Sequence, residues 1–298
     1  MSERTSGIRP IIVRTAIGDA YGAGFEFTTN PARPNDLGGF APHPMSGQVG
    51  YTDDTLRSIA NARVMLSADA RGIHRPDRYA DAYLAIHRQD GRDGWSKRFK
   101  AMLERHDGGS GADFMEALER RPTNGCLMGA AVIGMLPDAG KVRLAATMQT
   151  VSTHSASAAP YTQAVSLAAH HLLNGGSIES VLDYCLAGAD WTGERQRHAF
   201  ARLASGDPPE PEMASETVAA AALWGIANWD RTSDLLRWAC SSGRDTDSLA
   251  AVCMALSACT DEIEDDLPDA LVRGIEDVED MDQLRRIDAS LASRFERT

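Results

Sequence analysis

The sequence has few aromatic residues and almost no alternating runs of β-branched residues. Aromatic side chains make up 6% of the 298 residues, and the best β-like run is the short Ile-Ile-Val stretch at 11–13. Sheets need such residues because they pack well on a pleated surface. The hydrophobic fraction of 43% is nevertheless large enough for a sizeable core. We therefore expect an all-α protein, built from helices packed on helices.

Long apolar runs and clusters of basic residues are also missing. No run approaches the roughly 20 apolar residues of a membrane span, and the N-terminus has no stretch of signal-peptide length. The formal net charge is −12, and residues 261–280 hold ten acids against the single Arg273. Duplex nucleic acid and anionic membranes both require clustered Lys and Arg. We expect neither as a partner, and a cytoplasmic location is the default expectation.

Cysteine is scarce, and its five positions contain no Cys-x-x-Cys spacing. The number is odd, and most of the positions lie inside apolar helical patterns. We expect reduced core residues rather than disulfides or zinc ligands. The five are Cys126, Cys185, Cys240, Cys253 and Cys259.

Apolar residues recur at spacings of three and four along much of the chain, which is the pattern of a helix face. The pattern predicts helices at about 9–24, 52–68, 76–88, 95–105, 122–136, 160–174, 177–187, 214–228, 232–240 and 245–259, and another short helix that follows the glycine-rich loop 106–114. No linker divides these helices into two sets, so we expect one domain over 1–298. Its acidic helical tail, at about 261–298, should present a solvated face, with a partner site as the alternative. The polar segment 28–50 is long for a connection, and such loops are commonly functional.

Two similar clusters of oxygen-bearing side chains begin two distant helices. Thr-Asp-Asp-Thr stands at 52–55 and Asp-Thr-Asp-Ser at 245–248. One aspartate at a helix start is usually a cap for free backbone N–H groups. Capping needs only one acid of each pair, however, and the two acids repel each other. A divalent cation would relieve this repulsion.

The ligand types restrict which metal could bind. Carboxylate and hydroxyl oxygens suit Mg²⁺, Ca²⁺ or Mn²⁺ and argue against a dedicated zinc site. With four or more carboxylates available, two ions about 3.5–4 Å apart are plausible. Such a pair could hold a hydroxyl, a phosphate or an attacking water.

Five motifs in order resemble those of the ADP-ribosylglycohydrolase family, which includes the dinitrogenase reductase-activating glycohydrolase. They are GDAYGAGFEF at 18–27, TDDT at 52–55, TNGCLMGAA at 123–131, TH at 153–154 and GRDTDS at 243–248. The resemblance implies a compact orthogonal helical bundle with two Mg²⁺ ions, or Mn²⁺, in a central cleft. It also implies hydrolysis of the N- or O-glycosidic bond of ADP-ribosylated protein side chains, with arginine as the first expected acceptor and ADP-ribose as the product.

The resemblance also assigns site residues. The implied metal ligands are Thr52, Asp53 and Asp54 for one ion, and Asp245, Asp247 and Ser248 for the other. The implied catalytic carboxylates are Glu26, Asp54 and Asp245. The implied substrate contacts are Asp19, Gly109, Ser110, Gly111, Asn124, Gly125, His154 and Arg244.

Several of these residues have simpler interpretations. Asp19 could cap a helix, Asn124-Gly125 is a common tight-turn pair, and His154 could be a hydrogen-bonded core residue. Glu26 could be an exposed glutamate at a helix end. Asp90 and Asp93 are weaker candidates for the proton-transfer role.

The sequence departs from the family pattern at two positions. Arg244 stands where the last motif usually has a glycine, and Gly129 stands where the Asn-Gly motif usually ends in arginine. Arg244 could pair with an aspartate, contact a phosphate or block the site. These departures keep two alternatives open: a hydrolase of another ADP-ribose-containing or phosphate-containing small molecule, and a non-catalytic ADP-ribose-binding protein. The oligomeric state is not determined by the sequence, with a monomer slightly favoured.

Overall fold

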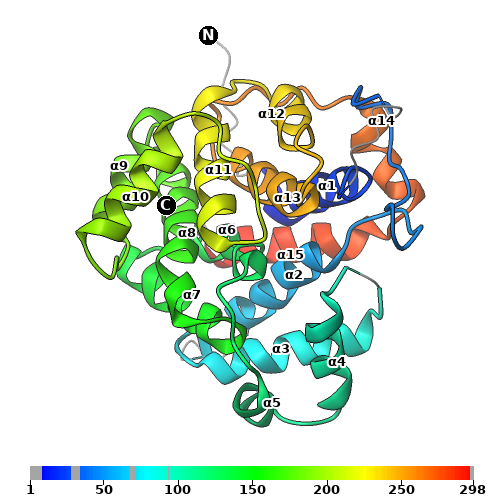
Figure 1. Ribbon diagram of the computed structural model, residues 1–298. Helices are drawn as coiled ribbons and strands as arrows, with labels where there is room; N and C mark the ends of the chain where they lie inside the picture. Colours follow the sequence, from blue (N-terminus) through cyan, green and yellow to red (C-terminus); the bar gives the residue numbers. More distant parts are fainter. Residues whose placement is uncertain (1–8, 28–33, 68–71, 93, 296–298) are drawn as a thin grey trace.

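The computed structural model describes residues 9–27, 34–67, 72–92 and 94–295. Within these ranges every regular element is helical, which confirms the all-α prediction (Figure 1). The first eight α-helices are α1 (Ile11–Ala23), α2 (Asp53–Leu66), α3 (Pro76–Gln89), α4 (Lys97–Arg105), α5 (Gly111–Ala117), α6 (Ala130–Ile133), α7 (Ala139–Thr153) and α8 (Ala159–Leu173). The others are α9 (Ile178–Gly188), α10 (Glu194–Ser205), α11 (Ser215–Asn228), α12 (Thr232–Ala239), α13 (Thr246–Ser257), α14 (Asp269–Val272) and α15 (Met281–Arg294). Four short 3-10 helices are η1 (Gly72–His74), η2 (Asn124–Cys126), η3 (Ala156–Ala158) and η4 (Gly274–Asp277).

Two helices have no counterpart among the predicted ones, and one prediction was wrong. Helix α7 buries polar side chains, including Gln149 and Thr150, so its sequence carries almost no apolar stripe. Helix α10 is mostly charged and buries only Phe200 and Ala204. The single helix predicted at 122–136 is instead η2 followed by the short α6.

The close packing of α1 against α13 fixes the centre of the molecule. A side chain at Gly18 would place its Cβ 2.4 Å from the carbonyl oxygen of Ala250, and one at Gly22 would lie 2.5 Å from that of Thr246. Gly22 also accepts a hydrogen bond of 2.8 Å from the Thr246 hydroxyl. The glycines of α1 therefore serve close helix contact, and α1 and α13 lie side by side (Figure 1).

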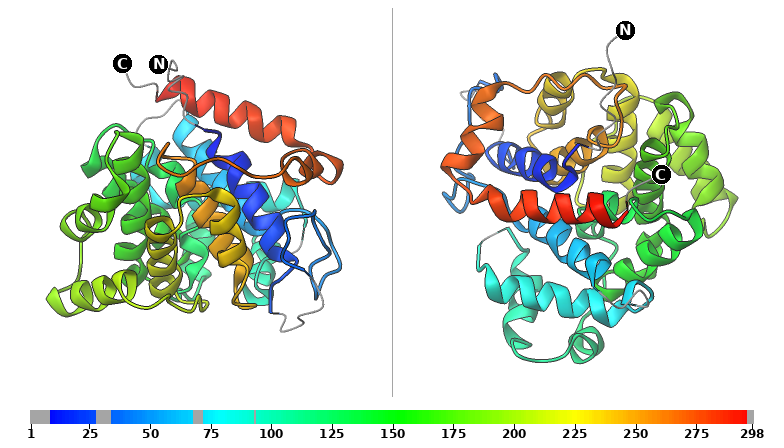
Figure 2. Two further views of the ribbon diagram at one scale, coloured as in Figure 1. Left: turned by 90° about the horizontal axis from the view of Figure 1, so that it is seen from above. Right: turned by 180° about the vertical axis from the view of Figure 1, so that it is seen from behind.

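The C-terminal region packs on the helices that carry the site. Helix α15 lies across α1 and α2, as the view from behind shows (Figure 2). Its buried Asp288 accepts hydrogen bonds of 3.0 Å from the backbone N–H groups of Ile12 and Val13, which caps α1. Most acids of 261–280 are exposed, as expected. Glu279 is an exception, because it receives two hydrogen bonds from Arg92.

The buried apolar side chains form one continuous cluster that runs from Ile11 of α1 to Leu291 of α15. One domain over 1–298 stays a prediction. All five cysteines are buried as free thiols. In the described ranges, we find no helix of sufficient length and hydropathy to cross a bilayer.

Candidate active site

Asp19 of α1 holds the start of α2. Its carboxylate is fully buried and accepts hydrogen bonds from the backbone N–H and the hydroxyl of Thr52, at 2.9 and 2.8 Å, and of Thr55, at 2.9 and 2.7 Å. Burial raises the pKa of Asp19 to about 6, although the four hydrogen bonds oppose this. Capping of α2 is thus performed by Asp19 and the Thr52 side chain. Asp53 and Asp54 are not needed for it.

The second cluster begins α13 in a similar way. Asp245 precedes the first residue of α13, is buried, and accepts a hydrogen bond of 2.7 Å from the side-chain amide of Asn124. Asp247 accepts one of 2.8 Å from the backbone N–H of Ser248. Asn124 lies in η2, so the Asn-Gly motif is tied to the aspartate cluster as well as to its own turn.

Two groups of three carboxylates meet between these helices. In the first, oxygens of Asp19, Asp54 and Asp247 lie within 4.8 Å of one another. In the second, oxygens of Glu26, Asp245 and Asp247 lie within 4.8 Å of one another, so Asp247 belongs to both groups. The helix starts that are 192 residues apart in the chain therefore lie next to each other and next to Asp19 of α1.

The electrostatics of this region favour a bound cation. Burial, and then the neighbouring carboxylates, raise the pKa values of Asp54 and Asp247 well above the usual range. The Oδ2 atom of Asp54 is buried and has no hydrogen-bond partner. An unsatisfied carboxylate oxygen among like charges is costly, whereas hard oxygen ligands suit Mg²⁺ or Mn²⁺. The donor set therefore fits a divalent metal centre.

Glu26 is fixed by a residue of the long loop, His43. The two side chains share a short hydrogen bond. Nδ1 of His43 accepts hydrogen bonds from the backbone N–H groups of Met45, at 3.2 Å, and Ser46, at 3.1 Å. In the neutral ring, Nε2 must therefore carry the hydrogen atom, and this N–H donates a hydrogen bond to the Glu26 carboxylate. Burial raises the pKa of Glu26, and the hydrogen bond from His43 opposes the rise.

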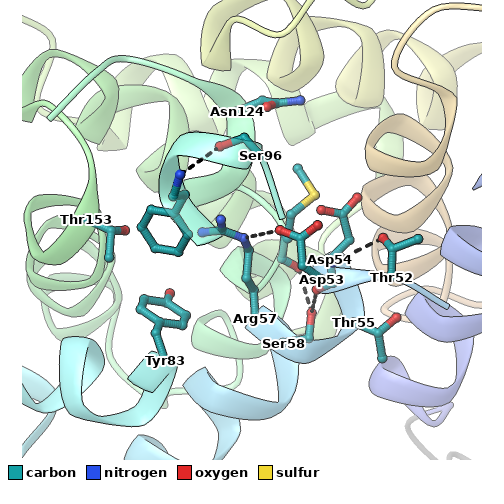
Figure 3. A network of polar contacts seen from close by, with 12 residues as sticks. Thr52, Asp53, Asp54, Thr55, Arg57, Ser58, Tyr83, Ser96, Asn124 and Thr153 are labelled. Atoms are coloured by element: carbon teal, nitrogen blue, oxygen red, sulfur yellow. Dashed lines mark hydrogen bonds and ion pairs between the residues drawn. The ribbon is translucent and has the colours of Figure 1, made fainter. Parts of the chain in front are cut away.

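Arg57 is a site residue that the sequence reasoning missed. Its Nε donates a hydrogen bond of 3.0 Å to Oδ2 of Asp53, as Figure 3 shows. The spacing of four within TDDTLRS was the available signal. His43 gave no such signal, because nothing in the sequence of a long loop shows which residue reaches the site.

Two more predicted residues lie beside Arg57. A Cβ added at Gly125 would be 3.0 Å from the Arg57 Cζ and 3.1 Å from the His154 Nε2. His154 is buried, and its Nδ1 lies 2.7 Å from the Thr153 hydroxyl. Burial and the charge of Arg57 lower the pKa of His154 well below its ordinary value, so its ring is neutral.

The remaining predicted residues lie elsewhere. Gly109, Ser110 and Gly111 lead into α5, which packs on α3 at the far edge of the bundle (Figure 1). There the Ser110 hydroxyl caps α5, and the Gly111 N–H donates to Asp81. These contacts give the glycine-rich loop a structural role. Asp90 pairs with Arg92, and Asp93 falls outside the described residues.

The two departures from the motif series have structural correlates. Arg244 is exposed and pairs with Glu210 at 3.2 Å rather than with a site aspartate. At Gly129 a Cβ would lie 2.1 Å from the Asn61 side-chain nitrogen, so α2 leaves no room for an arginine there.

Comparison with known proteins agrees with this arrangement. A family model described as ADP-ribosylglycohydrolase matches residues 3–297. The chain belongs to the ADP-ribosylglycohydrolase family. Members of this family are glycohydrolases that act on ADP-ribosylated substrates and generally use divalent metals. Membership therefore supports a hydrolase of the ADP-ribosylglycohydrolase type.

A solved structure described as "ADP-ribosylglycohydrolase-related protein complex" has the same fold. It is 24% identical to this family member, with a TM-score of 0.71, over 96% of this chain and 95% of the other. A search of curated proteins gives no significant match. Family membership indicates the type of reaction for this chain but not its substrate.

Proposed function

We propose that this protein is a metal-dependent hydrolase that cleaves the N- or O-glycosidic bond of ADP-ribosylated protein side chains, with arginine as the first acceptor to test, and releases ADP-ribose. The observation that carries the proposal is the meeting of two carboxylate groups that share Asp247. The buried, unpartnered Oδ2 of Asp54 adds to it. A binding scaffold without chemistry has no need to keep repelling acids together.

The metal centre is assigned to the residues at the two helix starts. Asp54, Asp245 and Asp247 would hold two Mg²⁺ ions, or Mn²⁺, and the hydroxyls of Thr52 and Ser248 are the proposed additional ligands. When bound, the ions would supply Lewis acidity and a fixed template for hydroxyl groups of the substrate.

Glu26 is the proposed proton-transfer carboxylate. Glycoside cleavage develops positive charge at the anomeric carbon and requires proton transfer at the leaving group or the attacking water. A raised pKa suits a carboxyl group that must both gain and lose a proton near neutral pH. The hydrogen bond from His43 holds the carboxylate beside Asp245 and Asp247.

The substrate contacts are proposed at the rim of the carboxylate cluster. Asn124 orients Asp245, and the backbone of Gly125 lies next to His154 and Arg57. Arg244 is exposed, and its carbonyl accepts a hydrogen bond of 3.0 Å from the N–H of Phe27, next to Glu26. We assign Arg244 to a phosphate of the ligand. A monomer in the cytoplasm is the expected setting.

The deciding experiment measures free ADP-ribose released from ADP-ribosyl-arginine and ADP-ribosyl-serine peptides, with Mg²⁺ or Mn²⁺ against EDTA. Asp54→Asn and Asp247→Asn should abolish release, whereas Asp282→Asn, an exposed acid on α15, should not. Metal-dependent binding of ADP-ribose without release from either peptide would contradict the proposal. That result would favour a small-molecule substrate or a binding role.

A further inference from the structure

Arg57 is a buried cation at the edge of the proposed metal centre. Its side chain is 6% exposed, and that of its partner Asp53 is 12% exposed. The pair forms within one turn of α2, between positions i and i+4. A charge taken out of water needs a close partner of opposite sign, because removal of either partner leaves the other uncompensated.

The surroundings hold the guanidinium independently of Asp53. The Cζ of Arg57 lies 4.7 Å from the ring centroid of Trp95, 4.8 Å from that of Phe99 and 5.7 Å from that of Tyr83. Aromatic faces attract a cation, especially where water is excluded. On another side the absence of a side chain at Gly125 makes room, since a Cβ there would lie 3.0 Å from Cζ. The guanidinium therefore occupies a place shaped for it.

Asp53 differs from the other acids of the site. Its Oδ2 receives the Arg57 hydrogen bond, and its Oδ1 lies against the backbone of Gly94, where an added Cβ would be 2.7 Å away. Asp53 is in neither of the two carboxylate groups that share Asp247. In Figure 3 the dashed contact from Arg57 ends on the Asp53 side chain. The contacts of Asp54 with Thr52 and Ser58 involve only its backbone.

We propose that Arg57 is a built-in counter-ion that removes Asp53 from metal binding, so that Asp53 positions α2 and the metal ions are held by the remaining carboxylates. The inference rests on the metal centre of the proposed function. It departs from the ligand set that the motif alone implies, since TDDT by itself offers both aspartates. The pair is neutral as a unit, and Asp54, Asp245 and Asp247 remain as the carboxylates that would hold the cations.

The test uses the metal-stripped full chain, Mn²⁺ alone and no substrate. Mn²⁺ affinity and stoichiometry are measured by titration calorimetry and by the electron paramagnetic resonance signal of free Mn²⁺. The decisive variant is the double substitution Asp53→Asn with Arg57→Met, which removes the two opposite charges together. Exchange of a whole buried pair for neutral groups is often tolerated, so we expect affinity within about threefold of the unmodified protein. Asp247→Asn should lose about 100-fold or more.

Two single substitutions separate charge from shape. Arg57→Met frees Asp53 inside the site, and affinity for Mn²⁺ should rise by about tenfold or more. Arg57→Lys keeps the positive charge but loses the planar group that lies over Trp95 and Phe99, so affinity for Mn²⁺ should rise less than in Arg57→Met. Thermal unfolding of each variant shows whether it has folded.

The outcomes distinguish this inference from the proposed function. If the double variant loses affinity as far as Asp247→Asn does, Asp53 is a ligand and the inference is overturned while the metal centre stands. If the unmodified protein binds no Mn²⁺, the metal centre and the inference both fall.

Discussion

His43 donates a hydrogen bond to Glu26, and this contact connects the long loop to the carboxylate cluster. The imidazole is itself oriented by the backbone of Met45 and Ser46. The loop therefore fixes both the direction of the ring and the identity of the nitrogen that carries the proton. The loop is also anchored through Asn35 and Leu37, which both hydrogen-bond to the Tyr21 hydroxyl. A loop held in this way can position the proposed proton-transfer carboxylate without being a helix.

Replacement of His43 should impair turnover more than substrate binding. We expect His43→Leu to lower kcat by about 10–100-fold with little change in KM, because Glu26 would lose its orientation while the rim contacts remain. His43→Gln keeps a donor and should recover part of the rate. Steady-state release of ADP-ribose measures both parameters. A loss confined to KM would show that His43 acts on substrate binding instead.

Asp54 should make the metal-free protein less stable and the metal-bound protein more stable. Its raised pKa shows that the charged form is unfavourable among its neighbours. We therefore expect Asp54→Asn to raise the Tm of the metal-free protein by about 2–6 °C. The same substitution should remove the rise in Tm that saturating Mn²⁺ gives the unmodified protein.

The control for this prediction is Asp282→Asn, which changes charge equally on the exposed face of α15. It should leave the response to Mn²⁺ unchanged and lower the metal-free Tm only slightly, because Asp282 loses a weak exposed ion pair with Arg285. A lower Tm for metal-free Asp54→Asn would show that Asp54 stabilises the fold by itself.

Periodicity and motif order predicted most of the helices and the two aspartate clusters that begin α2 and α13. Stripes of apolar residues mark α2 and α13, and the acids at their starts are visible in the sequence. Their meeting was implied by the family resemblance, and the structure supplies the physical reason: glycines in α1 allow α13 to approach its backbone.

The rest of the site depends on tertiary contacts that carry no local pattern. Arginine in a helix is usually solvated. Arg57 is buried because it packs against Trp95, which precedes α4, and Phe99, which lies in α4. Helix α7 was missed because its buried face is polar. The glycine-rich loop before α5 was expected to contact the substrate, but its Ser110 caps the short helix α5 at the edge of the bundle.

Gly18 should tolerate no side chain. Alanine there would press its Cβ into the backbone of α13, which cannot move aside as a flexible side chain can. We expect Gly18→Ala to lower the free energy of unfolding by about 2–4 kcal/mol. It should also weaken Mn²⁺ binding, since α13 carries the proposed ligand Asp247 and α1 holds the start of α2 through Asp19. Denaturant unfolding measures the first effect. Gly91→Ala, where a Cβ meets nothing within 4 Å, is the matched control and should change stability by less than about 1 kcal/mol.

Asp288 should make stability depend on pH in a direction opposite to that of most paired carboxylates. Burial raises its pKa to about 6 in the folded protein, against about 3.9 when unfolded. The folded state therefore holds the proton more tightly, so the contribution is fully present below about pH 4 and is lost as the pH rises through about 6.

Asp288→Asn isolates this effect because the amide does not titrate. It keeps one acceptor oxygen for the N–H groups of Ile12 and Val13, which bond to separate oxygens of Asp288, and the loss of the other hydrogen bond does not depend on pH. The difference in free energy of unfolding between the unmodified protein and this variant should fall by about 2–3 kcal/mol between pH 4 and pH 7. Urea unfolding of the metal-free proteins across this range measures the difference, and the other titrating groups cancel. A difference that stays constant with pH would show that Asp288 keeps its ordinary acidity in the cap of α1.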